Sequence, residues 1–247
     1  MSARLLFISD LHLEDSRPDI TESLLEFLDR ESGRCSALYI LGDLFEVWLG
    51  DDTDDPLAQR VADALQAFAS AGAQVFLMHG NRDFLIGDDF ARRCGASLLS
   101  DPTVIETRLG PVLLSHGDSL CTDDVDYQTF RAQVRNQQWQ QQFLSQPLAA
   151  RRAFAEQARA QSQAATSNKA MEIMDVNQQA VVSLLEEHSL PRLLHGHTHR
   201  PARHELNLAE QPGEAWRLVL GDWDSKAWFA EIEGTEVKLQ SFDLESS

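Results

Sequence analysis

The amino-acid sequence predicts an α/β fold. In the first half of the chain, short apolar runs alternate with stretches whose apolar residues recur at helical spacing, as expected for strands and helices packed on one sheet. Each apolar run ends in a turn that contains Asp, Asn, His or Gly. The last part has successive strand-like runs with few helices between them. This change predicts a mixed sheet or a two-sheet sandwich and not a purely parallel sheet.

The elements follow one another in a regular order. Four apolar runs are short enough for buried strands, at residues 5–9, 37–41, 74–78 and 112–115. Helical periodicity covers residues 20–31 and 57–71, and Pro56 stands where a helix favours proline, at its start. Further strands are expected at residues 193–194, 216–220, 227–232 and 237–242.

Residues 122–188 lack the strand pattern and are predicted to form a helical insertion. This stretch is rich in Gln and Ala, and between residues 127 and 169 it carries six basic residues against one acid, Glu156. The whole chain, in contrast, has a formal net charge of −18. A basic, partly apolar lid over an acidic core is the preferred interpretation, and a solvated helical face is the alternative. With this insertion, residues 1–247 are expected to form a single domain.

Composition and charge exclude several classes of protein. With 39 acidic and 21 basic residues, the chain is not expected to bind nucleic acid, because that affinity comes from clustered Lys and Arg. A phosphorylated substrate would need metal ions to mediate its contacts. The three cysteines, Cys35, Cys94 and Cys121, lack zinc-site spacing and are expected to be buried thiols. No apolar run approaches the roughly 20 residues of a membrane-spanning helix.

Potential metal ligands follow five of the expected strands. The motifs are Asp10-Leu11-His12, Gly42-Asp43, Gly80-Asn81-Arg82-Asp83, His116-Gly117-Asp118 and His195-Gly196-His197-Thr198-His199-Arg200. Loops at strand ends converge on one crevice in α/β folds. Carboxylate, imidazole and amide groups suit manganese, iron, zinc or magnesium-like ions. Two such ions about 3.5–4 Å apart, bridged by a carboxylate, activate water and stabilise a phosphoryl group under attack.

This series of motifs resembles the calcineurin-like metallophosphoesterase family over residues 5–200. The resemblance implies an α/β/β/α sandwich that holds two divalent metal ions. It implies that one metal is held by Asp10, His12, Asp43 and His199, and the other by Asp43, as the bridge, with Asn81, His116 and His197. His195 is outside this set and is expected to make hydrogen bonds in the core. The role of Asp83 stays open between orienting a ligand, orienting Arg82 and capping the next segment.

One position departs from the family pattern. The third motif commonly has His after the Asn, and here that residue is Arg82. Because a guanidinium stays protonated, Arg82 is unsuited to general-acid catalysis and suited to clamping a phosphate. A clamp in place of an acid favours a leaving group that needs little protonation, such as a phosphate monoester leaving from a pyrophosphate.

Longer strings, at residues 41–46, 79–85, 116–124, 173–178 and 195–201, are similar to one branch of this family, the UDP-2,3-diacylglucosamine pyrophosphatases of the lipid A pathway in Gram-negative bacteria. That similarity implies hydrolysis by metal-activated water at the α-phosphate, which gives UMP and 2,3-diacylglucosamine 1-phosphate. It implies Mn²⁺ as the usual metal, and a peripheral place on the cytoplasmic face of the inner membrane with no obligate protein partner. The implied substrate contacts are Asn81, Arg82, Asp124, Ser162, Thr166, Lys169 and His197.

Two fatty-acyl chains require an apolar groove, because water-exposed methylenes cost about 0.8 kcal/mol each. Apolar residues of the insertion are candidates for this groove, with packing onto the core as the alternative for each: Trp139, Phe143, Leu144, Leu148, Phe154, Met171 and Met174. Arg151, Arg152 and Arg159 are candidates for lipid head groups or substrate phosphates, with solvation as the alternative. Two other functions stay open. One is a different dinuclear phosphoesterase, such as a dinucleoside polyphosphate hydrolase or a protein phosphatase. The other is a non-catalytic scaffold, which the complete set of ligand positions disfavours.

Overall fold

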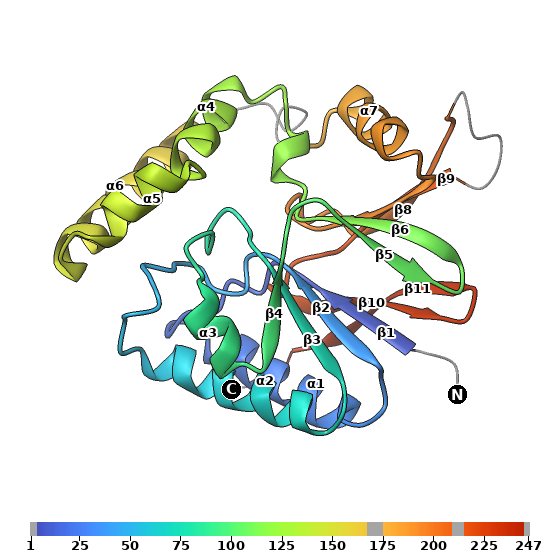
Figure 1. Cartoon of the computed structure of the whole chain (residues 1–247), viewed down its shortest axis with the longest axis horizontal. Helices are drawn as coiled ribbons and strands as arrows, with labels where there is room; N and C mark the ends of the chain where they lie inside the picture. Colours follow the sequence, from blue (N-terminus) through green and yellow to red (C-terminus); the bar gives the residue numbers. More distant parts are fainter. Residues whose placement is uncertain (1–3, 167–174, 209–214, 245–247) are drawn as a thin grey trace.

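The computed structural model describes residues 4–166, 175–208 and 215–244 as two β-sheets packed face to face, with helices on the outer faces (Figure 1). The strands are β1(Arg4–Ile8), β2(Ala37–Leu41), β3(Gln74–Met78), β4(Ala96–Leu99), β5(Thr103–Thr107), β6(Gly110–Ser115), β7(Arg192–His195), β8(Ala202–Leu206), β9(Ala215–Val219), β10(Lys226–Glu233) and β11(Glu236–Asp243). The helices are α1(Pro18–Glu31), α2(Pro56–Ser70), α3(Asp88–Arg93), η1(Asp118–Leu120), α4(Val125–Val134), α5(Gln137–Leu144), α6(Leu148–Thr166) and α7(Gln178–His188).

Both sheets are mixed, and the predicted two-sheet sandwich is confirmed. The first sheet has the order β11-β10-β1-β2-β3-β4, with β1 to β4 parallel and β10 antiparallel to β1. The second has the order β5-β6-β7-β9-β8, in which β6, β7 and β9 are parallel and the edge strands are antiparallel. Strands β4, β5 and β8 and helix α3 were not predicted from the sequence. In β8, for example, only Leu206 is buried, so the strand has almost no apolar pattern.

Alternating side chains of the strands build separate apolar layers. In β1, Leu6 and Ile8 pack with Phe27 of α1, whereas Phe7 faces the second sheet, in the same cluster as Leu194. Helix α7 covers the opposite face of the second sheet through Val181 and Leu185, which join a cluster with Leu113 and Leu193. The architecture is therefore α/β/β/α, as the sequence resemblance implied.

Helices fill the described part of residues 122–188, and they divide into two groups. Helices α4, α5 and α6 run together as an arm beside the sandwich, while α7 lies over the second sheet (Figure 1). Phe143 of α5 joins the large core cluster and Trp139 packs against it, whereas Phe154 is 38% exposed. Helices α4 to α6 are hereafter called the lid. None of the described helices is long and apolar enough to cross a bilayer.

Arg151 corrects one expectation about the lid. Neither solvent nor a lipid head group surrounds it, because its side chain is 3% exposed and is paired with both carboxylate oxygens of Asp52. It also donates a hydrogen bond to the carbonyl of Leu49. Arg151 therefore attaches α6 to the loop between β2 and α2. The cysteines are buried with free thiols, as predicted.

Candidate dinuclear metal centre

Turns that follow β1, β2, β3, β6 and β7 meet at one end of the sandwich and bring the predicted ligands together. Two groups have ligand atoms that all lie within 4.8 Å of one another: Asp10, His12 and His199 form the first group, and Asp43, His116 and His197 form the second. The seventh predicted ligand, Asn81, joins the second group, because its Oδ1 accepts a hydrogen bond from His116 Nε2 at 2.9 Å.

Asp43 lies between the two groups. Its Oδ2 is 3.7 Å from His12 Nε2 and 3.8 Å from His116 Nε2, so one carboxylate faces an imidazole of each group. Its Oδ1 accepts the backbone N–H of Arg82 at 2.8 Å, which fixes the orientation of the carboxylate. This is the placement that a bridging ligand requires.

The backbone at these side chains is unusual. Five of the seven predicted ligands have positive φ angles: Asp10 at 55°, His12 at 50°, Asp43 at 52°, His197 at 68° and His199 at 55°. Left-handed backbone is costly for residues other than glycine and concentrates at functional sites. Ser189 completes the positive-φ residues other than glycine in the described chain.

Two glycines allow the turns to approach so closely. A Cβ at Gly80 would collide with the side chain and backbone of Asp43, and a Cβ at Gly196 would collide with Asp10 and Ser9. The ligand-bearing turns are therefore packed against one another, and any larger residue at either glycine would separate them.

The donor set fits divalent cations. Asp10 is fully buried, and its Oδ1 has no hydrogen-bond partner of good geometry among the described residues, although His199 Nε2 lies 3.3 Å away. The Nε2 atoms of His12 and His199 are 3.4 Å apart. Imidazole nitrogens and a carboxylate oxygen that lie this close together form a set of atoms that a divalent cation would coordinate.

The electrostatics of the site agree with this fit. Burial opposes the ionised form of Asp10, but the adjacent imidazoles, His199 first, hold its pKa well below the usual range. Burial likewise opposes charging of His116, yet the carboxylates of Asp43 and Asp10 raise its pKa to about 9. For Asp43 burial prevails and raises the pKa to about 6. These shifts arise because buried carboxylates and imidazoles lie close together, a charge distribution that bound cations would complete.

Outer partners orient the imidazoles. His116 Nδ1 donates to the carbonyl of Leu41 at 2.8 Å, and His12 Nδ1 donates to Glu46 Oε2 at 2.7 Å, so both rings present Nε2 to the centre. His199 Nδ1 lies 3.3 Å from Asp222 Oδ2. Neither Glu46 nor Asp222 was predicted from the sequence as a partner. The available signal was that Asp222 follows the end of β9, as the predicted ligands follow other strands.

The structure decides between the open roles of Asp83. Its buried carboxylate accepts backbone N–H groups from Gly80 at 2.8 Å, Leu44 at 2.7 Å and Asp43 at 3.3 Å. Asp83 therefore clamps the turn after β2 to the turn after β3. His195 is fully buried, as expected, and its Nδ1 donates to the carbonyl of Gly196 at 2.8 Å.

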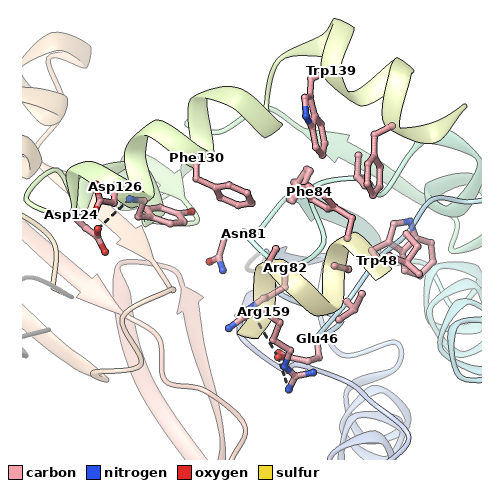
Figure 2. Close-up of a pocket in the computed structure, with 18 residues that line it drawn as sticks. Glu46, Trp48, Asn81, Arg82, Phe84, Asp124, Asp126, Phe130, Trp139 and Arg159 are labelled. Atoms are coloured by element: carbon pink, nitrogen blue, oxygen red, sulfur yellow. Dashed lines mark hydrogen bonds and ion pairs between the residues drawn. The ribbon is translucent and has the colours of Figure 1, made fainter. Parts of the chain in front are cut away.

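A cavity of about 320 Å³ opens beside Asn81, the predicted ligand that joins the second group (Figure 2). Its polar end carries Asn81, Arg82 and Asp124, and Glu46 and Arg159 form one wall. Its apolar part lies between the core loops and the lid and is lined by Trp48, Phe84, Phe130, Trp139, Phe143 and Phe154.

The predicted substrate contacts are only partly described. Asn81, Arg82 and Asp124 line the cavity, and His197 lies in the adjacent metal group, with its ring under that of Tyr127. Lys169, Met171 and Met174 lie outside the described residues, as do the side chains of Ser162 and Thr166.

A sandwich with this cluster at its strand ends is the architecture of a metal-dependent phosphoesterase. The chain belongs to the calcineurin-like phosphoesterase family, whose model matches residues 3–201. It is 54% identical to the UDP-2,3-diacylglucosamine hydrolase of Cellvibrio japonicus over 97% of this chain and 99% of that protein. It is 48% identical to the enzyme of the same name from Escherichia coli over 96% and 98% of the two chains. Vacuolar Protein Sorting 29 from Cryptosporidium parvum has the same fold, with a TM-score of 0.51 at 13% identity over 99% of this chain and 92% of that one.

Proposed function

We propose that the protein hydrolyses the pyrophosphate bond of UDP-2,3-diacylglucosamine, with water attacking the α-phosphate, to give UMP and 2,3-diacylglucosamine 1-phosphate for lipid A biosynthesis. The observation that carries this proposal is the apolar cavity that opens directly beside the candidate metal centre. In this arrangement the diphosphate of the substrate would lie at the metal groups and its acyl chains in the cavity. The polar end of the cavity, at Asn81 and Arg82, would lie between them. The names of the relatives support the same substrate.

We assign two divalent cations, most simply Mn²⁺, to the seven predicted ligands, with Asp43 as the bridge. When bound, such a pair lowers the pKa of a water molecule and neutralises charge on the phosphoryl group. The chain's own residues do the rest. Asp83 and Glu46 keep the ligand turns and His12 in place, and Arg82 offers a permanent cation to the phosphate.

The lid supplies the lipid specificity in this proposal. Trp139 stacks on Phe143 with ring centroids 4.9 Å apart, and Phe154 packs on Phe143 at 5.3 Å, which gives the cavity a continuous aromatic wall. Each methylene that leaves water for this wall contributes about 0.8 kcal/mol. The chain would thus function as one catalytic domain with a lid. Of the remaining substrate contacts predicted from the sequence, Ser162 and Thr166 belong to the last part of α6, and Lys169 follows it in the sequence.

A place on the cytoplasmic face of the inner membrane follows from the substrate. Val47 and Phe154, at the cavity, are 40% and 38% exposed, and Leu144 of the lid is 38% exposed. Arg152 is also exposed on α6. Exposed apolar residues with a nearby cation suit peripheral contact with anionic lipid. Neither nucleic acid nor an obligate protein partner is part of this proposal.

The test is incubation with UDP-2,3-diacylglucosamine and Mn²⁺ in H₂¹⁸O, with and without a chelator, followed by product identification. Chelator-sensitive formation of UMP carrying ¹⁸O is the expected result. Label in the sugar phosphate would instead mean attack on the β-phosphate. Efficient hydrolysis of a dinucleoside polyphosphate, with no reaction on the diacyl substrate, would replace this function by the alternative phosphoesterase.

A further inference from the structure

The carboxylate of Glu46 contacts groups with three different tasks. Its Oε2 accepts a hydrogen bond from Nδ1 of the predicted ligand His12 at 2.7 Å. Its Oε1 lies 3.0 Å from Nη2 of Arg159, on lid helix α6, and 3.8 Å from Nη1 of Arg82. Figure 2 shows Glu46 and the two guanidinium groups together at one wall of the cavity. Glu46 is thus placed between the candidate metal centre, the candidate phosphate clamp and the lid.

The backbone holds Glu46 in this position. Beyond the ends of β1 and β2 the two segments of the chain stay paired, with a parallel bridge between Leu13 and Phe45. The N–H of Glu46 donates to the carbonyl of Leu13 at 3.2 Å, and the N–H of Leu13 donates to the carbonyl of Leu44 at 3.0 Å. Because His12 and Glu46 project from these two segments, their contact is set by backbone that stays paired just beyond the strands.

The Glu46 carboxylate is nearly buried among these donors. Glu46 is 9% exposed, with Oε2 bonded to His12 and Oε1 facing the guanidinium groups of Arg82 and Arg159. A hydrogen-bond acceptor on one ring nitrogen fixes the orientation and tautomer of a histidine, so that the other nitrogen faces the metal.

We propose that Glu46 is a positioning residue for both halves of the reaction centre. Through Oε2 it holds the His12 ring with Nε2 directed at the first metal group. Through Oε1 it keeps Arg82 and Arg159 beside the path of the diphosphate and fixes α6 over the cavity. The first part concerns metal binding alone, whereas the second part rests on the proposed function.

Two substitutions separate these parts. In Glu46→Ala the His12 ring loses its acceptor and both arginines lose their anion. In Glu46→Gln an amide oxygen still accepts from His12 Nδ1, but the charge that holds the arginines is gone. The matched control is Glu14→Gln, because Glu14 Oε2 lies 3.9 Å from Arg159 Nη1 and the residue is not a predicted ligand.

The first measurement is titration of chelator-treated protein with Mn²⁺ alone. Glu46→Ala should weaken one of two Mn²⁺ sites by about 10- to 100-fold, the usual cost of removing the outer partner of a ligating histidine. Glu46→Gln and Glu14→Gln should titrate like the wild type. Wild-type affinity at both sites in Glu46→Ala would overturn the role in positioning His12. If that variant does not fold, Glu46→Asp, which keeps the charge but shortens the reach, should show the same weakened site.

The second measurement is steady-state hydrolysis of UDP-2,3-diacylglucosamine at saturating Mn²⁺. Glu46→Gln should raise KM about tenfold with little change in kcat, since a charge-assisted contact on each arginine is lost. Unchanged KM would overturn the role toward Arg82 and Arg159. Absence of wild-type turnover, with both Mn²⁺ sites intact, would reject the proposed substrate and with it this second part, while the Mn²⁺ titration would still decide the first part.

Discussion

The hydroxyl of Tyr127, on the first helix of the lid, donates a hydrogen bond to Asp118 Oδ2 at 2.6 Å. Arg131, one turn further along α4, donates to the same oxygen at 2.8 Å. Asp118 is fully buried and follows the His116-Gly117 turn, so the start of the lid is tied to a ligand-bearing turn of the core. The lid is therefore positioned by polar contacts at its base as well as by its aromatic face.

Asp118→Ala should destabilise the protein by about 3 kcal/mol, because it leaves Tyr127 and Arg131 without their common acceptor. Thermal unfolding measures the effect as a lowered Tm. Asp126→Asn is the control, since Asp126 is exposed on the same helix and should leave Tm unchanged. Equal melting of Asp118→Ala and the wild type would mean that this network does not hold the lid.

Asn81→Ala and His116→Ala should abolish turnover while the protein stays folded. Each removes a predicted ligand of the second group, and loss of one such group is expected to lower kcat by on the order of 10²-fold or more. Activity assays and circular dichroism check the two halves of this prediction, and the Mn²⁺ content of the purified variants checks the loss of a ligand. His188→Ala, which removes an imidazole from α7, should retain full activity and metal content. Substantial activity in Asn81→Ala would remove Asn81 from the ligand set.

Arg82→Ala should lower kcat/KM by about 10- to 100-fold and leave the Mn²⁺ content intact, because the side chain is a phosphate clamp in the proposal and not a ligand. Arg82→Lys should restore part of the loss, since an ammonium keeps the charge but not the two parallel N–H donors. The measurement is the steady-state kinetics of both variants with UDP-2,3-diacylglucosamine as substrate. Normal kinetics in Arg82→Ala would refute the clamp.

Strand-exit motifs such as Asp10-Leu11-His12 were predictable because a strand places the residues just beyond its end at a known edge of the sheet. Contacts between residues from distant segments of the sequence were not predictable. Arg151 and Asp52 are far apart in sequence, and each alone looks like a solvated charge. Asp51 shows the same limit. Asp51 accepts the N–H groups of Gly87 and Phe90, contacts that exist only once α3 packs against the loop after β2.

Strands β4, β5 and β8, which lie at edges of the two sheets, were missed for a related reason. β4 is only four residues long and half-buried, and β8 exposes the charged residues Arg203 and Glu205 and buries only Leu206. Neither carries the continuous apolar run by which β2, which is fully buried, was recognised. These segments become strands because they pair with a neighbouring strand. That pairing cannot be recognised from the residues of the segment alone.

Glu31 should make stability depend on pH. Burial would raise its pKa, but the hydrogen bond from Arg4 and the charge of Arg30 lower it below the ordinary value. A carboxyl whose pKa is lowered on folding stabilises the protein above the pKa of the unfolded chain, and the contribution disappears as pH falls through the folded pKa. Glu31→Gln should cost about 1.5–3 kcal/mol at pH 7 and progressively less below about pH 4. Urea unfolding at several pH values measures the difference, and Glu22→Gln, at an exposed ion pair with Arg60, should change nothing measurable. A cost of Glu31→Gln that is the same at pH 3 and pH 7 would contradict the assignment.

Trp139 should discriminate between substrates with and without acyl chains. Its indole stacks on Phe143 and lies over Phe84 at 6.4 Å, so Trp139→Ser opens the aromatic wall of the cavity and leaves the candidate metal centre untouched. KM for UDP-2,3-diacylglucosamine should rise by about tenfold or more, because burial of several methylenes is lost. Any slow hydrolysis of UDP-glucosamine, which has no acyl chains, should be unaffected. Val104→Ser, on the exposed face of β5, is the matched apolar-to-polar control. If Trp139→Ser slowed both substrates equally, the cavity would serve the stability of the lid and not the recognition of lipid.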